Sequence, residues 1–279
     1  MEINPVNIDD KDTVFHYTNM RVAIEHILFQ RQLRFSKSVK TNDPREYNDW
    51  VFSAAGQSSH SNNNILSPEK YVEANFKINQ IIKSDYKLAC FCSNKIPNPS
   101  DGNYVSTIQH GYDRLRMWSQ YGEAFYGICI AFSASSLKQQ LREQLGGSTS
   151  IYANHVDYDQ DLRVTDRNLK WLNGNDLMGK DVDKVANAYV EKEENIKGIF
   201  FTKHIDYSGE NEYRIIVHDP DNSFEYLDIS KCFKAVLLGD RFPVVYKKMI
   251  KNFCDELNIE GKEVKWRYGK LSLTNIDYR

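Results

Sequence analysis

The chain has 279 residues, which is enough for one large domain or two small ones around a sizeable core. Its formal net charge of −2 gives no general electrostatic footprint for nucleic acid, although a local basic patch stays compatible with it. No stretch approaches the roughly 20 apolar residues that a membrane span needs, and the N-terminus lacks the basic and apolar regions of a signal peptide. These features predict a cytoplasmic protein with no membrane partner.

The five cysteines are odd in number and scattered along the chain, so a disulfide framework is not expected. Cys90 and Cys92 flank Phe91 in an apolar run, but no second Cys/His pair with zinc spacing accompanies them. We interpret them as buried strand thiols and expect no metal site. The others are Cys129, Cys232 and Cys254.

The N-terminal part alternates strand and helix patterns. Residues 14–18 form a β-favouring run in which His16 lies beside Val14 and Thr18. Apolar residues spaced by three and four then predict a helix over 20–28, with Thr18 or Asn19 as its N-cap. A second strand is expected at 33–36, followed by a turn at 41–44.

Later segments alternate in the same way, and residues 53–70 are polar and predict a surface loop or insertion. With no internal repeat and no domain-length linker, the pattern predicts a single α+β domain over residues 1–279 with helical insertions. Helices are expected at 71–82, 114–121, 134–145, 176–197 and 244–258, and strands at 86–92, 126–132, 152–158, 200–204, 212–218, 233–239 and 263–268.

The run from Glu210 to Val217 places charges on an apolar strand. Alternation puts Glu212, Arg214 and Ile216 on one face, and buried charges are unfavourable unless they are paired. Two interpretations stay open. The two charges belong to a solvated face or pair with each other, or they mark a functional site together with His16.

Short motifs in a fixed order resemble the bacterial DUF2971 family, whose function is poorly defined. They span most of the chain, from about residue 14 to residue 240. The matching residues are Phe15-His16-Tyr17-Thr18, Thr41-Asn42-Asp43-Pro44-Arg45-Glu46, Cys92-Ser93, Met117-Trp118-Ser119-Gln120-Tyr121, Gly127-Ile128-Cys129-Ile130-Ala131-Phe132 and Glu210-Asn211-Glu212-Tyr213-Arg214.

The order His, Tyr, Glu across successive segments is also similar to the H-Y-E branch of ADP-ribosyltransferases, which includes DarT-like nucleic-acid modifiers. This resemblance implies a split central mixed or antiparallel sheet flanked by helices, and NAD as a substrate without a metal. It further implies that His16 holds a ribose hydroxyl, Tyr121 stacks on nicotinamide and Glu212 binds the nicotinamide ribose. Glu210-Asn211-Glu212 matches the E-x-E pattern of the arginine-modifying branch, whose Ser-Thr-Ser motif this chain lacks.

Several further side chains are candidates for binding NAD. Arg34 and Arg214 have the guanidinium geometry that suits a pyrophosphate, although Arg214 could equally orient Glu212. Tyr17 and Trp118 are candidate stacking surfaces or core residues, and Thr18 completes the first motif. No glycine-rich phosphate loop occurs, so a Rossmann-type site is not expected.

The favoured function is an NAD-dependent ADP-ribosyltransferase that acts on a macromolecular acceptor, nucleic acid or protein. The setting implied is a bacterial toxin or phage-defence effector with an antitoxin or defence-system partner. We expect His16 and Glu212 to lie on adjacent central strands and to face one cleft. The alternatives are a non-catalytic sensor or binding module of the same fold, and a metal-dependent nuclease that uses His16, Asp43, Glu46 and Glu212.

Overall fold

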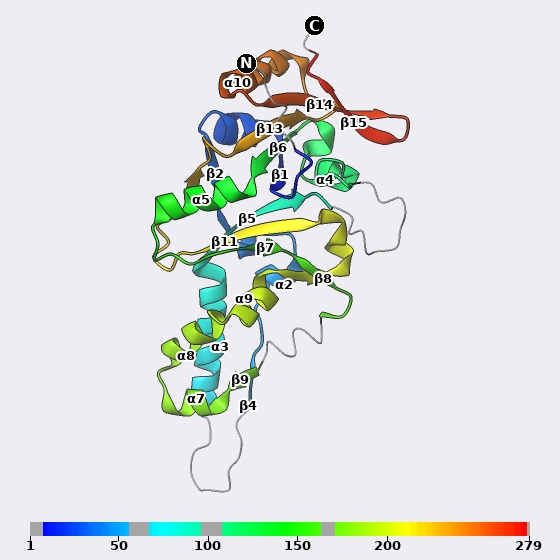
Figure 1. Cartoon of the computed structure of the whole chain (residues 1–279). Helices are drawn as coiled ribbons and strands as arrows, with labels where there is room; N and C mark the ends of the chain where they lie inside the picture. The colour runs from blue at the N-terminus through cyan, green and yellow to red at the C-terminus, as the bar shows by residue number, and fades with distance from the viewer. Residues whose placement is uncertain (1–7, 56–66, 96–107, 163–170, 278–279) are drawn as a thin grey trace.

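A nine-stranded sheet runs through the protein, whose computed structural model describes residues 8–55, 67–95, 108–162 and 171–277 (Figure 1). The strand order is β15-β14-β13-β6-β1-β5-β11-β7, and β3 pairs with β5 beside this path. Neighbours are antiparallel except β13 and β14, which are parallel. The predicted α+β class with a mixed, mostly antiparallel sheet flanked by helices is therefore confirmed.

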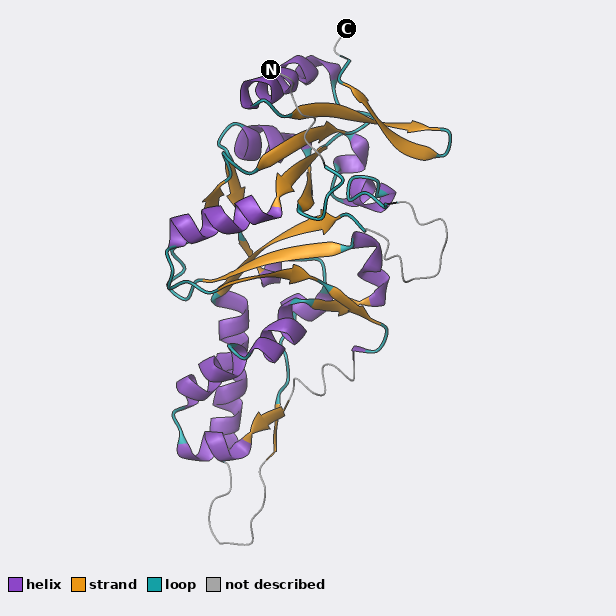
Figure 2. Cartoon of the chain, in the orientation of Figure 1, coloured by secondary structure: helices purple, strands orange, loops and turns teal. Residues whose placement is uncertain are grey.

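The strands of this sheet, drawn in orange in Figure 2, come from segments between Thr13 and Asn275. They are β1 (Thr13–Thr18), β3 (Ser36–Lys37), β5 (Tyr86–Ser93), β6 (Ile128–Ser133), β7 (Ile151–His155), β11 (Glu212–His218), β13 (Phe233–Leu238), β14 (Glu260–Arg267) and β15 (Lys270–Asn275). Three small sheets pair β2 (Gln32–Arg34) with β12 (Tyr226–Asp228), β8 (Asp157–Asp159) with β10 (Thr202–His204), and β4 (Ser53–Ala55) with β9 (Trp171–Asn173).

Several helices begin at a residue whose side chain caps them, whereas α4, α9 and α10 begin without a side-chain cap. Asn19 accepts a hydrogen bond from the Val22 amide at the start of the first helix, and Asp43 caps α2. The helical elements are α1 (Met20–Val22), η1 (Ala23–Leu28), η2 (Ser38–Lys40), α2 (Pro44–Tyr47), α3 (Pro68–Ser84), α4 (Leu115–Gln120), η4 (Glu123–Phe125), α5 (Ala134–Leu145), α7 (Gly174–Gly179), α8 (Val182–Val190), α9 (Glu193–Phe200), η5 (Ile205–Glu210) and α10 (Val244–Leu257).

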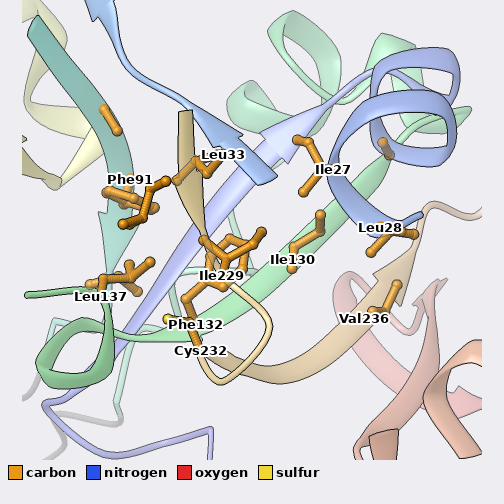
Figure 3. Packing of buried hydrophobic residues seen from close by; sticks show 14 of the residues in the cluster. Ile27, Leu28, Leu33, Phe91, Ile130, Phe132, Leu137, Ile229, Cys232 and Val236 are labelled. Atoms are coloured by element: carbon orange, nitrogen blue, oxygen red, sulfur yellow. The ribbon is translucent and has the colours of Figure 1, made fainter. Parts of the chain in front are cut away.

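One face of the sheet packs into a single large apolar cluster. Tyr213, Ile215 and Val217 of β11 lie there, as alternation predicts. Phe91 and Phe132 from neighbouring strands join them, beneath side chains of η1, α5 and α10 (Figure 3).

The opposite face is covered by two separate apolar clusters. Ile216 packs with side chains of α3, α8 and α9, whereas Phe15, Tyr17 and Cys129 pack with Trp118 of α4. Cys90 packs against the first cluster and Cys92 belongs to the second, so the two clusters meet along β5. Glu212 and Arg214 are the cross-strand partners of Cys92 and Cys90, which places both charges at this junction.

The sheet parts between β1 and β5. These strands pair only at Val14–Ser93 and Phe15–Cys92. Beyond that point β1 continues along β6, while β5 pairs with β11 over the full length of β11. The two strands therefore diverge beyond Phe15 and Cys92.

Four expectations about elements are corrected by the structure. The helix predicted over 176–197 is three helices, because Asp181 caps a new helix by accepting from the Lys184 amide and Lys192 starts another. The strand predicted over 152–158 divides into β7 and β8, which belong to different sheets.

The strand predicted at 200–204 is shorter, because α9 extends to Phe200 and β10 begins at Thr202. Of the polar stretch 53–70, Ser53–Ala55 is a paired strand and Pro68 begins α3. Positions 56–66 of that stretch lie outside the described residues.

Candidate functional site

A cavity of about 260 Å³ lies where β1 and β5 part. His16 and Tyr17 of β1 line it, as do Cys90 and Cys92 of β5. Its remaining walls carry polar side chains from β2, the η2–α2 connection, α4 and the segment around β10 and β11. These are Arg34, Ser36, Lys40, Thr41, Asn42, Tyr121, Lys203, Glu210 and Glu212.

Arg214 is fully buried and holds two carboxylates together beneath the cavity. Its Nε and Nη2 atoms donate to the two oxygens of Glu212 at 2.6 and 3.1 Å, which is a bidentate contact. Nη2 also lies 2.5 Å from Oε1 of Glu46, and Nη1 donates to the Phe200 carbonyl at 2.6 Å. The guanidinium therefore ties β11, α2 and the end of α9 into one unit.

Lys203 joins a second glutamate to the same unit. Its Nζ atom lies 2.8 Å from Oε2 of Glu212 and donates to Oε2 of Glu210 at 3.1 Å. The Tyr121 hydroxyl donates to Oε1 of Glu210 at 3.2 Å and accepts from the Asn42 amide at 3.5 Å. A continuous chain of polar contacts thus runs from Arg214 to the cavity wall formed by α4.

We call Glu46, Lys203, Glu210, Glu212 and Arg214 the cavity cluster. All five side chains are buried, and they comprise three carboxylates and two cations. Burial opposes ionisation of Glu212, but Arg214 and Lys203 outweigh it and lower the pKa of this carboxyl to about 2. Burial likewise opposes the charges on Lys203 and Arg214, and Glu212 outweighs it, so the pKa of each is raised.

His16 is partly buried at the edge of the gap. Burial lowers the pKa of its imidazole, against the hydrogen bond with the Cys90 carbonyl. Nδ1 lies 3.1 Å from that carbonyl oxygen, which can only accept, so Nδ1 carries the proton. In the neutral ring Nε2 is consequently left as a hydrogen-bond acceptor.

The expected neighbour relation between His16 and Glu212 is wrong. β5 lies between β1 and β11, and Glu212 is level with Phe15 because both oppose Cys92. Alternation then sends His16 to the other face, where its ring contacts Phe91 edge-on. Both side chains still line the one cavity, because the strands separate immediately after Phe15.

The other candidate binding residues divide into two groups. Tyr17, Arg34 and Tyr121 line the cavity with His16 and Glu212. Trp118 is instead fully buried in the core, where it stacks on Phe125 with ring centroids 5.6 Å apart. Arg214 and Thr18 are also buried, and neither belongs to the cavity lining, so the role of Arg214 as the partner that holds Glu212 accounts for its position.

Sequence reasoning missed Lys203 and gave Glu210 no role of its own. The available signal was the position of Lys203. It lies just after the apolar pair Phe200–Phe201 and shortly before Glu210-Asn211-Glu212. The sequence predicts only a turn around Asn42, and it assigns no role to Lys40. Their arrival at the cavity depends on how η2 and α2 fold back over β5, which local pattern does not encode.

The nuclease hypothesis requires acidic side chains that converge on a metal. Glu46 and Glu212 do converge, but on the guanidinium of Arg214. Among the residues that the structure describes, no group of three or more His, Cys, Asp or Glu side chains could hold a metal ion. All five cysteines are free thiols.

The fold and the cavity define an α+β protein with a polar cavity in a parted sheet, lined by two carboxylates and three cations among other residues. Residues 117–215 match the family model described as Protein of unknown function (DUF2971), so the resemblance to this family is confirmed. The match contains the motifs at 117–121, 127–132 and 210–214, whereas those at 15–18, 41–46 and 92–93 lie outside it. No curated protein and no solved structure matches the chain.

None of the helices among the described residues has both the length and the apolar composition needed to cross a bilayer.

Proposed function

We propose that this protein is an NAD-dependent ADP-ribosyltransferase, and that the nicotinamide riboside end of NAD enters the cavity between β1 and β5. The observation that carries the proposal is the charge of the buried cavity cluster. Among the described residues, its three carboxylates contact two cations, Arg214 and Lys203, and two of the three, Glu210 and Glu212, line the cavity.

This excess of negative charge suits the chemistry of NAD. The nicotinamide ring of NAD is a cation, and its departure leaves an oxocarbenium-like ribose. A fixed carboxylate beside the ring stabilises the charge that develops in the transition state and needs no reorganisation when the bond breaks. A carboxylate that Arg214 and Lys203 keep ionised meets this requirement.

Glu210 and Glu212 differ in the hydrogen bonds that they still have to offer. A carboxylate has about four acceptor positions. Glu212 uses three on Arg214 and Lys203. Glu210 accepts only from Tyr121 and Lys203 among the described groups. We therefore assign the direct contact with a ribose hydroxyl to Glu210, and the fixed negative charge to Glu212.

His16 and Tyr121 complete the proposed site. The unprotonated Nε2 atom of His16 is an acceptor for a second ribose hydroxyl, because Nδ1 is engaged by the Cys90 carbonyl. The ring of Tyr121 offers the stacking surface for nicotinamide.

The rim of the cavity carries cations that suit the pyrophosphate. Arg34 and Lys40 line the cavity and also a second hollow of about 190 Å³ beside it, which Lys37 lines as well. Arg34 is paired with Glu225 at 2.7 Å, but both side chains are about half exposed, so a phosphate can compete for the guanidinium. An extended ligand with its anionic centre at this rim would occupy both hollows.

The test is release of nicotinamide from NAD by the purified protein, with Glu210→Gln as the decisive variant. We expect turnover to fall roughly 10²–10³-fold, because the preorganised acceptor that positions the ribose hydroxyl in the transition state is lost. Lys248→Gln on the exposed face of α10 is the control for a general effect of charge. Full activity in Glu210→Gln would contradict this assignment, and absence of both NAD binding and turnover in the wild type would refute the proposal.

The acceptor is a macromolecule in this proposal, and the setting is a cytoplasmic toxin or phage-defence effector with an antitoxin or defence-system partner. Incubation of the protein with cell lysate and NAD labelled in its adenylate phosphate, followed by separation of protein from nucleic acid, identifies the acceptor. NAD binding without any labelled product would instead support the non-catalytic sensor.

A further inference from the structure

The β14–β15 hairpin lies at one end of the central sheet and projects beyond the helices around it (Figure 1). Its two strands are joined by Tyr268 and Gly269, since Arg267 pairs directly with Lys270. All residues from Trp266 to Lys270 are exposed, including a Trp ring that is 51% exposed and a Tyr ring that is 99% exposed. In the sequence, Arg267 lies between the two aromatic residues and Lys270 follows the turn.

The turn itself holds an unfavourable residue. Tyr268 and Gly269 both have positive φ angles, 51° and 79°, as in the two-residue turns that suit hairpins. Asn, Asp or Gly is preferred at the first of these positions, because a larger side chain is disfavoured in the left-handed region. A fully exposed tyrosine here neither packs in the core nor favours the turn, so folding gives no reason for it.

The charges at the tip are also unfavourable for the hairpin alone. Arg267 and Lys270 are direct cross-strand neighbours, and like charges in this position repel. Arg267 makes no ion pair with any residue that the structure describes, while Lys270 is close enough to Asp113 for their charges to interact. Lys265, further from the tip, is neutralised by Asp240 and Glu263. The positive charge is thus concentrated at the tip of a protein whose net charge is −2.

We propose that the tip of the β14–β15 hairpin binds single-stranded nucleic acid. Exposed aromatic rings stack on unpaired bases whatever their sequence, and neighbouring Arg and Lys side chains contact the phosphates. Trp266 and Tyr268 provide the rings, and Arg267 and Lys270 provide the charges. An anionic membrane would also attract the cations, but the apolar side chain nearest the tip, Leu271, is buried, which leaves no aliphatic surface to insert.

Nucleic-acid binding by the hairpin does not depend on the NAD chemistry, so NAD is omitted from the test. The probe is a fluorescent single-stranded oligonucleotide of about 12 nucleotides, as DNA and as RNA, followed by fluorescence anisotropy over a range of salt concentrations. We expect the wild type to bind with an affinity that falls as salt rises.

Tyr268→Asn is the sharpest variant, because Asn-Gly is the preferred sequence for this turn and the protein should melt no lower than the wild type. We expect its affinity, and that of Trp266→Ala, to fall roughly five- to hundredfold. Arg267→Gln should reduce the slope of log affinity against log salt by about 0.7. Tyr246→Ala and Lys248→Gln, exposed aromatic and basic residues on α10, should leave binding unchanged.

Several outcomes would overturn the proposal. Wild-type protein that binds neither oligonucleotide would do so, as would a folded Tyr268→Asn variant that binds as well as the wild type. Co-sedimentation with phosphatidylserine–phosphatidylcholine vesicles, without oligonucleotide binding, would identify the hairpin as a membrane contact instead. Tighter binding to duplex DNA that is insensitive to Tyr268→Asn would show that stacking on unpaired bases is not the mode of binding.

Discussion

Two charge networks in this protein, one buried beside the cavity and one partly exposed at the end of the sheet, differ in their charge balance. At the end of the sheet, Lys247 of α10 contacts Glu263 at 2.7 Å, and Lys265 contacts Glu263 and Asp240 at 3.1 and 2.9 Å. We call these four residues the α10 network. Its two cations and two carboxylates balance, whereas the cavity cluster holds three carboxylates against two cations.

The charge balance of a network indicates whether it needs a further partner. A balanced buried network satisfies its own charges and needs no further partner. An unbalanced one keeps unfavourable negative charge in a place of low polarity, and this becomes useful only when a positive charge arrives. Glu210 and Glu212 line a cavity that could admit such a group.

The largest effect should follow removal of Arg214. Arg214→Met leaves Glu46 and Glu212 buried without their shared cation, and we expect the free energy of unfolding to fall by about 3–5 kcal/mol. The matched variant Lys247→Met should be milder, because Glu263 keeps Lys265. Urea unfolding monitored by circular dichroism measures both. Equal losses would remove the distinction between the two networks.

The next largest effect concerns activity. Glu212→Gln replaces the excess charge with a neutral amide of nearly the same shape, and we expect nicotinamide release to fall roughly 10²–10³-fold. Glu263→Gln should lower the stability of the protein by about as much as Glu212→Gln does, but without changing turnover per folded molecule. Comparison of kcat with thermal melts of both variants separates the two effects. A Glu212→Gln protein that melts like the wild type and stays fully active would contradict the role of this charge.

Acid should destabilise the protein through Glu212. Its pKa is about 2 in the folded protein against 4.5 ordinarily, so the folded state binds its proton less readily than the unfolded state. The resulting stabilisation, about 3 kcal/mol, is complete above pH 4.5 and disappears as the pH falls towards 2. Unfolding free energies measured across this range should fall less steeply in Glu212→Gln. Identical pH profiles would show that the pKa of Glu212 is not depressed.

His16 adds a smaller dependence at higher pH. Burial lowers its pKa from the ordinary value of 6.5, so the unfolded state binds this proton more readily and stability falls as the pH drops below that value. The His16→Ala variant should lose this part of the profile, and its KM for NAD should rise more than its kcat falls.

The smallest effect should come from the hydroxyl of Tyr121. Tyr121→Phe removes a 3.2 Å hydrogen bond to Glu210 but keeps the ring, so we expect stability to change by about 1 kcal/mol or less and NAD binding by only a few fold. Tyr121→Ala removes the stacking surface and should weaken NAD binding by about tenfold. Calorimetric titration of the two variants measures the ratio. Equal binding by both would rule out stacking on this ring.

Much of the fold was readable from local sequence because the relevant signals are periodic. The alternation in Glu212–Val217 correctly assigned each side chain of β11 to a face. The helix over 134–145 was also placed correctly, with Ser133 as its N-cap and Gly146, at a φ of 77°, at its end. The breaks within 176–197 were not foreseen, because the charged pattern continues across the points where Asp181 and Lys192 begin new helices.

Local sequence was enough to predict the α+β class, most of the central strands and the placement of Glu212 and Arg214 on one face of β11, since these follow from side-chain alternation and capping within a few residues. Tertiary structure alone decided that β5 separates His16 from Glu212, and that the sheet parts so that both line one cavity. It also brought Glu46 to Arg214 and Lys203 to Glu212 from other segments. The charge balance of the cavity cluster is a sum over β11, β10, η5 and α2, and no local pattern encodes such a sum.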